Sequence, residues 1–166
     1  PAHSVVQRLV DVVSKNGNLL LNIPQRGDGS IDSDERAILA DIAAWMKVNG
    51  EAIFETRPWR VYGEGPTEVQ AGMHGEGAAR PWTGRDIRFT TKSEALYAFI
   101  LDWPDDRRTV VRSLAVGRAG RIERAELLGG GALPFRQTDE ALVIDLPEGR
   151  PVATAPAVRL SGTGLV

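Results

Sequence analysis

The hydrophobic positions of the first sixty residues predict two amphipathic helices. Apolar side chains recur at the three- and four-residue spacing of a helix face in two stretches. These are Val6, Leu9, Val10 and Val13, and then Ile38, Ile42 and Trp45. Ser4 with Gln7, and Asp32 with Glu35, have the spacing of a capping box at a helix start. Asn16-Gly17 and Gly50 end the two helices, with Gly17 expected in the left-handed position.

A nearly continuous apolar run, 18–23, separates these two helices. A strand of this composition is covered on both faces, as in a parallel sheet, and therefore needs parallel neighbours. The sequence holds no second strand–helix unit, and a complete eightfold strand–helix barrel takes about 250 residues. We therefore expect the sheet of this strand to be encoded upstream of Pro1, which would make the chain the C-terminal piece of a longer protein.

From about Asp86 onward the hydrophobic period changes to two, which predicts β-strands. The stretches 86–92 and 96–103 alternate and form a predicted hairpin with its turn at 92–94. Further short strands are predicted at 110–114, 122–128, 133–137, 141–146 and 157–160. Six or seven short strands with regular turn signals favour an antiparallel β-sandwich. The stretch 57–85 is rich in Gly, Pro and Trp without a period, and we predict an ordered connecting segment there.

Composition and charge exclude several classes of protein. The chain has 166 residues, 42% of them hydrophobic and 25% charged, which is typical of a folded globular protein and not of a disordered one. It has no cysteine, so disulfides, thiol nucleophiles and cysteine-ligated zinc are excluded. A formal net charge of −2 gives no reason to expect a nucleic-acid partner. No apolar run reaches the roughly 18 residues of a membrane span, so no membrane partner is expected.

Short motifs do not identify a catalytic or metal site. His3 and His74 have no further ligand at a useful spacing, so no metal site and no cofactor are expected. Residues 28–35 match the second half of a calcium loop, but Pro24 and Arg26 occupy the first ligand positions and cannot bind calcium. The stretch is more simply a turn followed by a capped helix. The many carboxylates fall on helix exteriors and at caps, and their spacing defines no glycosidase pair.

Long collinear motifs carry more information than these short ones. They are LVDVVSKNGNLLLNI at 9–23, DG at 28–29, WMKVNGEAIF at 45–54, TRPW at 56–59, VYGEGP at 61–66 and DIRFTTK at 86–92. With these motifs the first hundred residues resemble the α-L-fucosidases of glycoside hydrolase family 29, and the likeness fades after 96–101. The family pattern Asn-Ile-Gly-Pro after the leucine run is Asn-Ile-Pro-Gln here, at 22–25. That departure concerns a loop at the barrel rim.

The resemblance implies an α/β segment followed by an all-β domain. In this family a catalytic strand–helix barrel precedes a C-terminal β-sandwich. Residues 1–58 are then the helix–strand–helix end of the (β/α) barrel, 59–85 a connecting segment and 86–166 the antiparallel β-sandwich.

The resemblance also implies an activity, which is removal of terminal α-L-fucose with retention by an aspartate nucleophile and a glutamate acid/base. In the family pattern both lie upstream of the motif at 9–23, so no catalytic residue is expected in this chain and the chain alone should be inactive. The partner is a fucosylated glycan, bound through the upstream part of the barrel. Leu19, where the family often places an apolar or aromatic residue near the sugar methyl group, is either a substrate contact or plain core. A bacterial protein in the periplasm or outside the cell is expected.

The aromatic residues support an alternative class of function and a structural hypothesis. Trp59, Trp82, Tyr97 and Trp103 together could form a sugar-binding platform, which would make the sandwich a carbohydrate-binding or scaffolding module. Alternatively, such residues pack at a seam between domains. We expect Trp59 in such a seam between barrel and sandwich, with Arg57 holding backbone carbonyls or a carboxylate such as Glu51 or Glu55.

Overall fold

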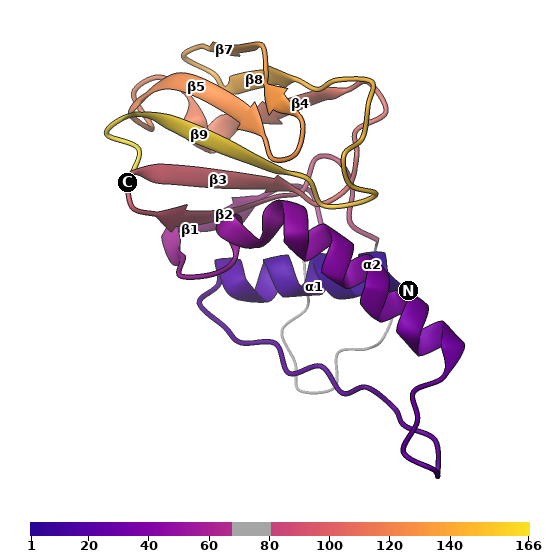
Figure 1. Ribbon diagram of the computed structural model, residues 1–166. Helices are drawn as coiled ribbons and strands as arrows, with labels where there is room; N and C mark the ends of the chain where they lie inside the picture. The colour runs from indigo at the N-terminus through magenta and orange to yellow at the C-terminus, as the bar shows by residue number, and fades with distance from the viewer. Residues whose placement is uncertain (68–80) are drawn as a thin grey trace.

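The computed structural model describes residues 1–67 and 81–166, and places them in three layers (Figure 1). The helical elements are α1 (Ala2–Ser14), α2 (Ser33–Asn49) and the short 3-10 turns η1 (Gly50–Ala52) and η2 (Arg112–Leu114). The strands are β1 (Arg57–Glu64), β2 (Ile87–Lys92), β3 (Ala95–Ile100), β4 (Arg108–Val111), β5 (Arg121–Leu127), β6 (Gly131–Ala132), β7 (Phe135–Gln137), β8 (Leu142–Asp145) and β9 (Ala157–Thr163).

Two antiparallel sheets form the predicted sandwich. The larger has six strands in the order β1-β2-β3-β9-β5-β6, and the smaller has three in the order β4-β8-β7. Helices α1 and α2 lie on the face of the larger sheet that points away from the smaller one (Figure 1). The fold class is therefore as predicted, a helical segment followed by an antiparallel β-sandwich.

Strand β3 shows why the larger sheet is covered on both faces. Leu96, Ala98 and Ile100 point into the core between the two sheets. The alternate side chains Tyr97 and Phe99 point into a second core, shared with the helices. All five are at most 4% exposed, so the period-two pattern of this strand is doubly apolar because each face meets its own layer. The predicted alternation is confirmed.

The two helices differ in how their first turns are capped. Asp32 caps α2, because its Oδ1 accepts hydrogen bonds from the backbone N–H of Asp34 (3.0 Å) and Glu35 (2.9 Å). The predicted cap at Ser4 is wrong: α1 already begins at Ala2, and the Ser4 hydroxyl donates to the Pro1 carbonyl at 2.9 Å.

The chain leaves α1 through a left-handed residue, but that residue is Asn16 and not Gly17. Asn16 has φ of 65°, whereas Gly17 N–H donates to the Val12 carbonyl at 2.9 Å. This is the hydrogen bond of a Schellman turn, in which the residue before the donor takes the left-handed conformation. Asparagine tolerates that conformation better than most residues, so the Asn-Gly pair ends the helix one residue earlier than expected.

The predicted strand at Leu19–Ile23 does not form. Residues 17–31 leave α1 as an irregular segment that runs below the helices, away from both sheets (Figure 1). Leu20 is 95% exposed and Leu21 is 42% exposed. The physical reason is the absence of neighbouring strands among the described residues. A strand that is apolar on both faces needs strands beside it, and the described strands all pair with one another in two antiparallel sheets elsewhere.

The first strand of the larger sheet, β1, was not predicted, and it makes part of the expected connecting segment an edge strand. Its pairing with β2 steps from Pro58 opposite Thr90 to Gly63 opposite Arg88. Residues 59–62 therefore bulge out of the ladder opposite one residue of β2, which removes the alternation that the sequence pattern relies on. A Cβ at Gly63 would overlap the Ile87 carbonyl, so the close approach of the two strands requires glycine there.

Candidate functional site

Leu19, the predicted substrate contact, lies half-buried in the irregular segment at 17–31. The segment contributes no residue to either cavity described below. Nearby, Asp28 Oδ1 accepts from the backbone N–H (2.9 Å) and the hydroxyl (2.7 Å) of Ser30, and these hydrogen bonds lower the pKa of the Asp28 carboxyl. The acidic stretch is thus a local turn, in line with the interpretation preferred over a calcium loop.

The most developed polar site is a cluster between α1 and the larger sheet, which we name the Asp11 cluster. It consists of Asp11 from α1, Lys15 directly after α1, Arg88 from β2, Tyr62 from β1, and Trp82. Arg88 Nε lies 2.6 Å from Asp11 Oδ1, and Lys15 Nζ lies 2.8 Å from Asp11 Oδ2. The guanidinium group lies over the rings of Trp82 (4.7 Å) and Tyr62 (5.4 Å). The arrangement is a buried ion pair closed by aromatic faces.

Helix α2 meets the same sheet through a second set of directed contacts. The Trp45 indole N–H donates to the Thr154 carbonyl at 3.0 Å, and its ring stacks on Phe99 at 6.2 Å. Asn49, fully buried at the end of α2, accepts a hydrogen bond from the backbone N–H of Ala157 at 3.1 Å. Helix α2 is therefore held to the sheet by side chains that satisfy backbone groups at its border.

Trp59 is buried, but not where a seam residue would lie. It is 7% exposed, its ring meets Phe89 edge-on at 4.9 Å, and its indole N–H donates to the Leu165 carbonyl at 2.6 Å. It belongs to the core between the two sheets, on the side of β2 away from the helices. The bulge in β1 turns the side chain inward, so the expected position between barrel and sandwich is wrong.

Of the two kinds of partner expected for Arg57, the structure shows a backbone carbonyl and not a carboxylate. Arg57 is exposed and donates from Nη1 to the Thr56 carbonyl at 3.0 Å. Glu55 instead pairs with Lys92 at 2.9 Å, and this hydrogen bond and the charge of Lys92 lower the pKa of the Glu55 carboxyl.

The aromatic residues do not form a platform. Trp59 and Trp103 are buried in the core between the sheets, whereas Tyr97 and Trp82 pack in the core beneath the helices. The Trp103 indole N–H donates to the Val152 carbonyl at 3.0 Å, as expected for a buried indole. Because the four rings lie on opposite faces of one sheet, no sugar ring could stack on them together.

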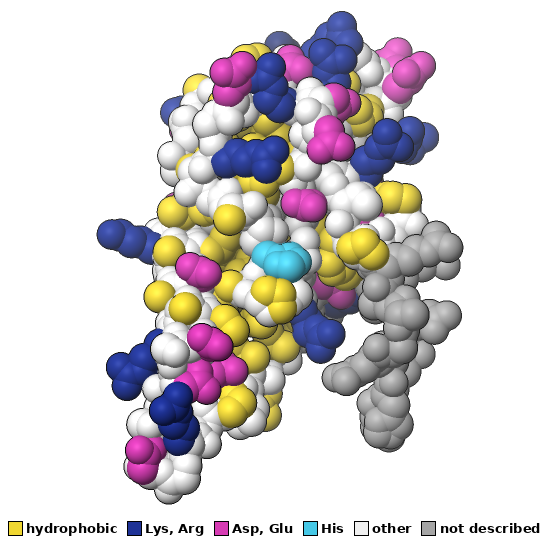
Figure 2. Space-filling model, turned by 90° about the vertical axis from the view of Figure 1, so that its right-hand side faces the viewer, with side chains coloured by type: hydrophobic (Ala, Val, Ile, Leu, Met, Phe, Trp, Pro, Cys, Tyr) yellow, Lys and Arg dark blue, Asp and Glu magenta, His cyan; other side chains and the backbone are white. Residues whose placement is uncertain are grey.

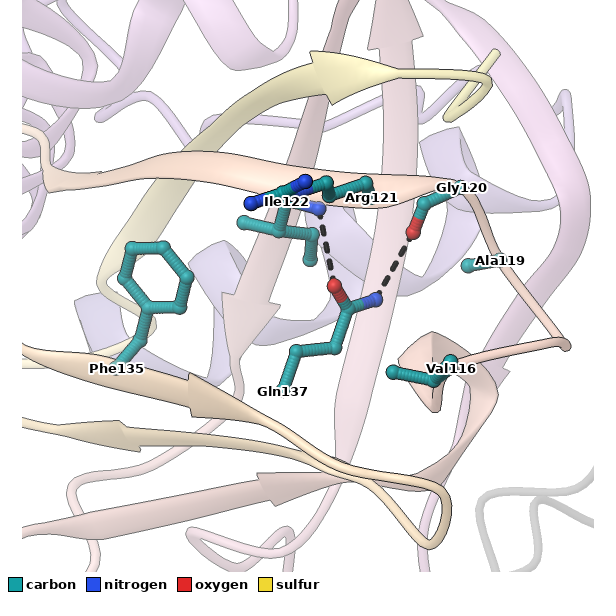
Figure 3. Close-up of a pocket in the computed structure, with 7 residues that line it drawn as sticks. All are labelled: Val116, Ala119, Gly120, Arg121, Ile122, Phe135 and Gln137. Atoms are coloured by element: carbon teal, nitrogen blue, oxygen red, sulfur yellow. Dashed lines mark hydrogen bonds between the residues drawn. The ribbon is translucent and has the colours of Figure 1, made fainter.

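A cavity of about 420 Å³ opens between the two sheets near β5 and β7 (Figure 3). Gln137 reaches across it, accepting from the Ile122 backbone N–H at 3.0 Å and donating to the carbonyls of Leu114 and Gly120, each at 2.9 Å. These hydrogen bonds occupy both the oxygen and the nitrogen of the amide, and they join the two sheets. Apart from Gln137, Arg121 is the one polar side chain among the lining residues, and the others, such as Phe135 and Val116, are apolar or glycine.

A second cavity, of about 400 Å³, lies at the start of α1, where His3 and Asp41 face the 151–154 loop. Within residues 1–67 and 81–166, no three side chains of His, Asp or Glu gather as metal ligands. His74 lies outside the described residues. Lys and Arg side chains are interspersed with Asp and Glu on the face shown in Figure 2, which offers no uniformly basic patch to a polyanion. Neither helix of the described residues is long and apolar enough to cross a bilayer.

Comparison with known proteins agrees with the geometry. The family model described as "Alpha-L-fucosidase" matches residues 1–51, and the model described as "Alpha-L-fucosidase C-terminal domain" matches residues 81–161. The tissue alpha-L-fucosidase of Rattus norvegicus is 32% identical over 148 residues, which are 88% of this chain and 28% of that protein. The human tissue enzyme is 30% identical over 155 residues, which are 92% of this chain and 29% of that protein.

Solved structures give the same result. An alpha-fucosidase of Thermotoga maritima, in complex with a mechanism-based inhibitor, superposes with a TM-score of 0.73 at 27% identity, over 97% of this chain and 34% of its own. A structure of the Thermotoga maritima enzyme with fucose gives 0.71 at 27% identity, over 96% and 34%. Mammalian relatives match as well as bacterial ones, so the expected bacterial origin is not supported. The chain spans little more than a quarter of the curated relatives it matches. It belongs to the α-L-fucosidases of glycoside hydrolase family 29 and corresponds to their C-terminal part.

Proposed function

We propose that this chain completes and braces the catalytic barrel of a retaining glycoside hydrolase that removes terminal α-L-fucose from glycoconjugates. One observation carries the proposal: the two family models match in order along one chain, with the helices of the first docked on the sandwich of the second. The solved relatives cover nearly all of this chain with about a third of their own length, which leaves the rest of them for the catalytic body.

The chain by itself supplies no fucosidase chemistry under this proposal. A retaining mechanism needs two carboxyl groups about 5 Å apart, one as nucleophile and one as acid/base. The family resemblance assigns both to the part of the protein that precedes residue 1, and we assign no residue of this chain to either role. Leu19 remains the proposed apolar contact to the sugar, and it would reach that position once the segment at 17–31 joins the barrel.

The domain division follows the layers. We propose that residues 1 to about 56 are the end of the barrel and that the sandwich starts with β1, because β1 pairs with β2 on both sides of its bulge. The stretch of 59–85 beyond β1 would connect β1 to β2. A periplasmic or extracellular location is proposed on the family resemblance, and a fucosylated glycan is the proposed partner.

The alternative of a sugar-binding module receives no support from the aromatic residues, since Trp59, Tyr97 and Trp103 are each at most 7% exposed. Scaffolding remains compatible with the structure. The face of the larger sheet that a ligand would need is already covered by α1 and α2.

An aryl α-L-fucoside assay tests the proposal. The 166-residue chain should release no aryl alcohol, while the protein expressed from the full reading frame that encodes it should release the alcohol and β-linked analogues should stay intact. Loss of a nucleophile or acid/base removes several orders of magnitude in rate, so the two samples should differ without ambiguity. Steady turnover by the 166-residue chain, or none by the full-length protein, would contradict the proposal.

A further inference from the structure

The contact of α1 with the larger sheet combines apolar burial with one charged pair. Val6 and Val10 are at most 1% exposed and pack into the core beneath the helices. Asp11, one residue further along, is 7% exposed and faces Arg88, which is 3% exposed. Gln7 Nε2 adds a hydrogen bond of 2.7 Å to the Leu101 carbonyl. A buried carboxylate and guanidinium are thus set into an otherwise apolar seam.

Both carboxylate oxygens of Asp11 and two of the three guanidinium nitrogens of Arg88 have partners. Arg88 Nε donates to Asp11 Oδ1, Arg88 Nη1 donates to the Ile87 carbonyl at 2.9 Å, and Lys15 takes the second carboxylate oxygen. The ring of Tyr62 lies beneath both cations, 4.9 Å from Lys15 Nζ and 5.4 Å from the guanidinium carbon of Arg88. A half-turn of α1 or a slide along its axis would leave these charges buried and unpaired, which is far more costly than the loss of an apolar contact.

Net stability does not account for such a pair. Two charges lose hydration when they are buried, and apolar side chains of the same volume are often equally stabilising. What the pair adds is a defined position of α1 on the sheet. Apolar surfaces can slide past each other, whereas a 2.6 Å hydrogen bond between two particular atoms is lost when the helix moves. A registry role of this kind is the best-attested use of buried polar groups.

The register of α1 determines where the following segment begins. Leu19 comes eight residues after Asp11. The turn between them is closed by the hydrogen bond from Gly17 to the Val12 carbonyl, so the end of α1 and the start of the segment move together. A shift of one helical turn would displace that start by about 5.4 Å.

We infer that Asp11 and Arg88 are positioning residues: their pair fixes the register of α1 on the sandwich and, through α1, the start of the segment that carries Leu19. The effect on Leu19 rests on the proposed function.

The test separates position from stability. In the double variant Asp11→Leu with Arg88→Met, the charges are replaced by apolar side chains of similar size. The matched control is Asp145→Leu with Arg108→Met, which removes the exposed β4–β8 ion pair at 3.2 Å. Because the chain has no cysteine, Arg8→Cys on α1 and Glu123→Cys on β5, both exposed positions, can carry two nitroxide labels in every background.

The parent chain and the control should each give one narrow distribution of distances between the labels. The double variant should unfold within about 5 °C of the parent, yet give a broad or split distribution. Arg88→Lys, which keeps the charge but loses the planar fork, should also broaden it and serves as the test if the double variant does not fold. A narrow, unshifted distribution in Arg88→Lys, or in a folded double variant, would overturn the inference.

The consequence for Leu19 is measured in the protein from the full reading frame. The double variant should lose about 10- to 100-fold in kcat/KM on the aryl fucoside, with a raised KM, while the control keeps the parent values. Unchanged kinetics together with a broadened distribution would overturn the link to Leu19. If the parent protein shows no hydrolysis, the proposed function fails and the distance result still decides the role of the pair.

Discussion

Two stretches of this chain have the composition of buried strands, and only one is buried. In β3 and the residue after it, every side chain from Leu96 to Leu101 is at most 4% exposed. In the segment at 17–31, Leu20 is 95% exposed and no strand forms. The difference is in what surrounds them: β3 has β2 and β9 beside it and a layer on each face, whereas the described residues offer the segment no neighbouring strand.

An apolar run therefore indicates that a segment must be covered, but it does not specify the structure that the segment adopts. Burial of a leucine side chain is worth about 1.5–3 kcal/mol, but only if another surface is present to exclude the water. The segment has the composition of a strand that is buried on both faces, but the described residues offer it no sheet to join. The proposed barrel supplies that sheet, and the covered region shows what the segment should look like once joined to it.

The largest expected change in the free energy of unfolding comes from removing the Trp59 ring, which lies in the core between the two sheets. Trp59→Ala should lower the free energy of unfolding of the 166-residue chain by about 3–5 kcal/mol, because it empties a volume next to Phe89 and leaves the Leu165 carbonyl without its donor. Urea denaturation followed by circular dichroism measures the change. A loss below about 1 kcal/mol would place Trp59 outside the inter-sheet core.

A matched pair of leucines compares the two regions directly. Leu96→Ala, at a side chain with no exposure, should cost about 2–5 kcal/mol of unfolding free energy. Leu20→Ala, at a side chain 95% exposed, should stay within about 0.5 kcal/mol of the parent. The same denaturation experiment measures both. Comparable losses at the two positions would mean that the segment is covered in the chain alone.

The border between the regions is marked by the cap of α2. Asp32→Ala should cost about 1 kcal/mol, because the backbone N–H groups of Asp34 and Glu35 lose their acceptor. Asp32→Asn should recover most of the loss, since an amide oxygen caps almost as well. If Asn destabilises as much as Ala, then the negative charge, and not the hydrogen bonds, stabilises this end.

The smallest expected effect is a pH dependence of the stability that comes from Tyr97, on the helix side of the larger sheet. Burial, and next the nearby Glu51 carboxylate, raise the pKa of Tyr97 above its ordinary value of 10.0, while Arg159 opposes them. The neutral phenol is thus favoured in the fold, so the stability is complete below about pH 10 and falls as the pH rises through the pKa of the folded state. Tyr97→Phe should show a shallower fall above pH 10. Parallel curves for the variant and the parent would refute the assignment.

The local elements were largely predictable because their signals are local. Period two identified β2, β3 and β5, and the spacing of apolar residues with a capping Asp32 identified α2. Strand β1 was not predicted, because its bulge at 59–62 breaks the alternation of apolar and polar residues. The strand expected at 19–23 was wrong for this chain because its pairing partners are not among the described residues, and a pattern shows the need for partners without showing whether they are present.

The site was less predictable, because it depends on distant pairs. Asp11 and Arg88 are 77 residues apart, and neither has a neighbour in sequence that marks it as paired. Trp59 was correctly expected to be buried, since an indole of that size needs cover, but which surface covers it depends on the bulge. Family motifs identified the class of protein, while the contact that joins its two parts needed coordinates.

In the 166-residue chain α1 and α2 pack on the sandwich, whereas the segment between them lies uncovered and needs the sheet of the proposed barrel. Amide hydrogen exchange, resolved by residue, tests this difference directly in the 166-residue chain and in the full-length protein. In the chain alone, residues 19–23 should exchange at rates near those of an unfolded peptide while α1, α2 and β3 are protected, and in the full-length protein 19–23 should become protected. Protection of 19–23 equal to that of β3 in the chain alone, or no protection of α1 there, would contradict the account.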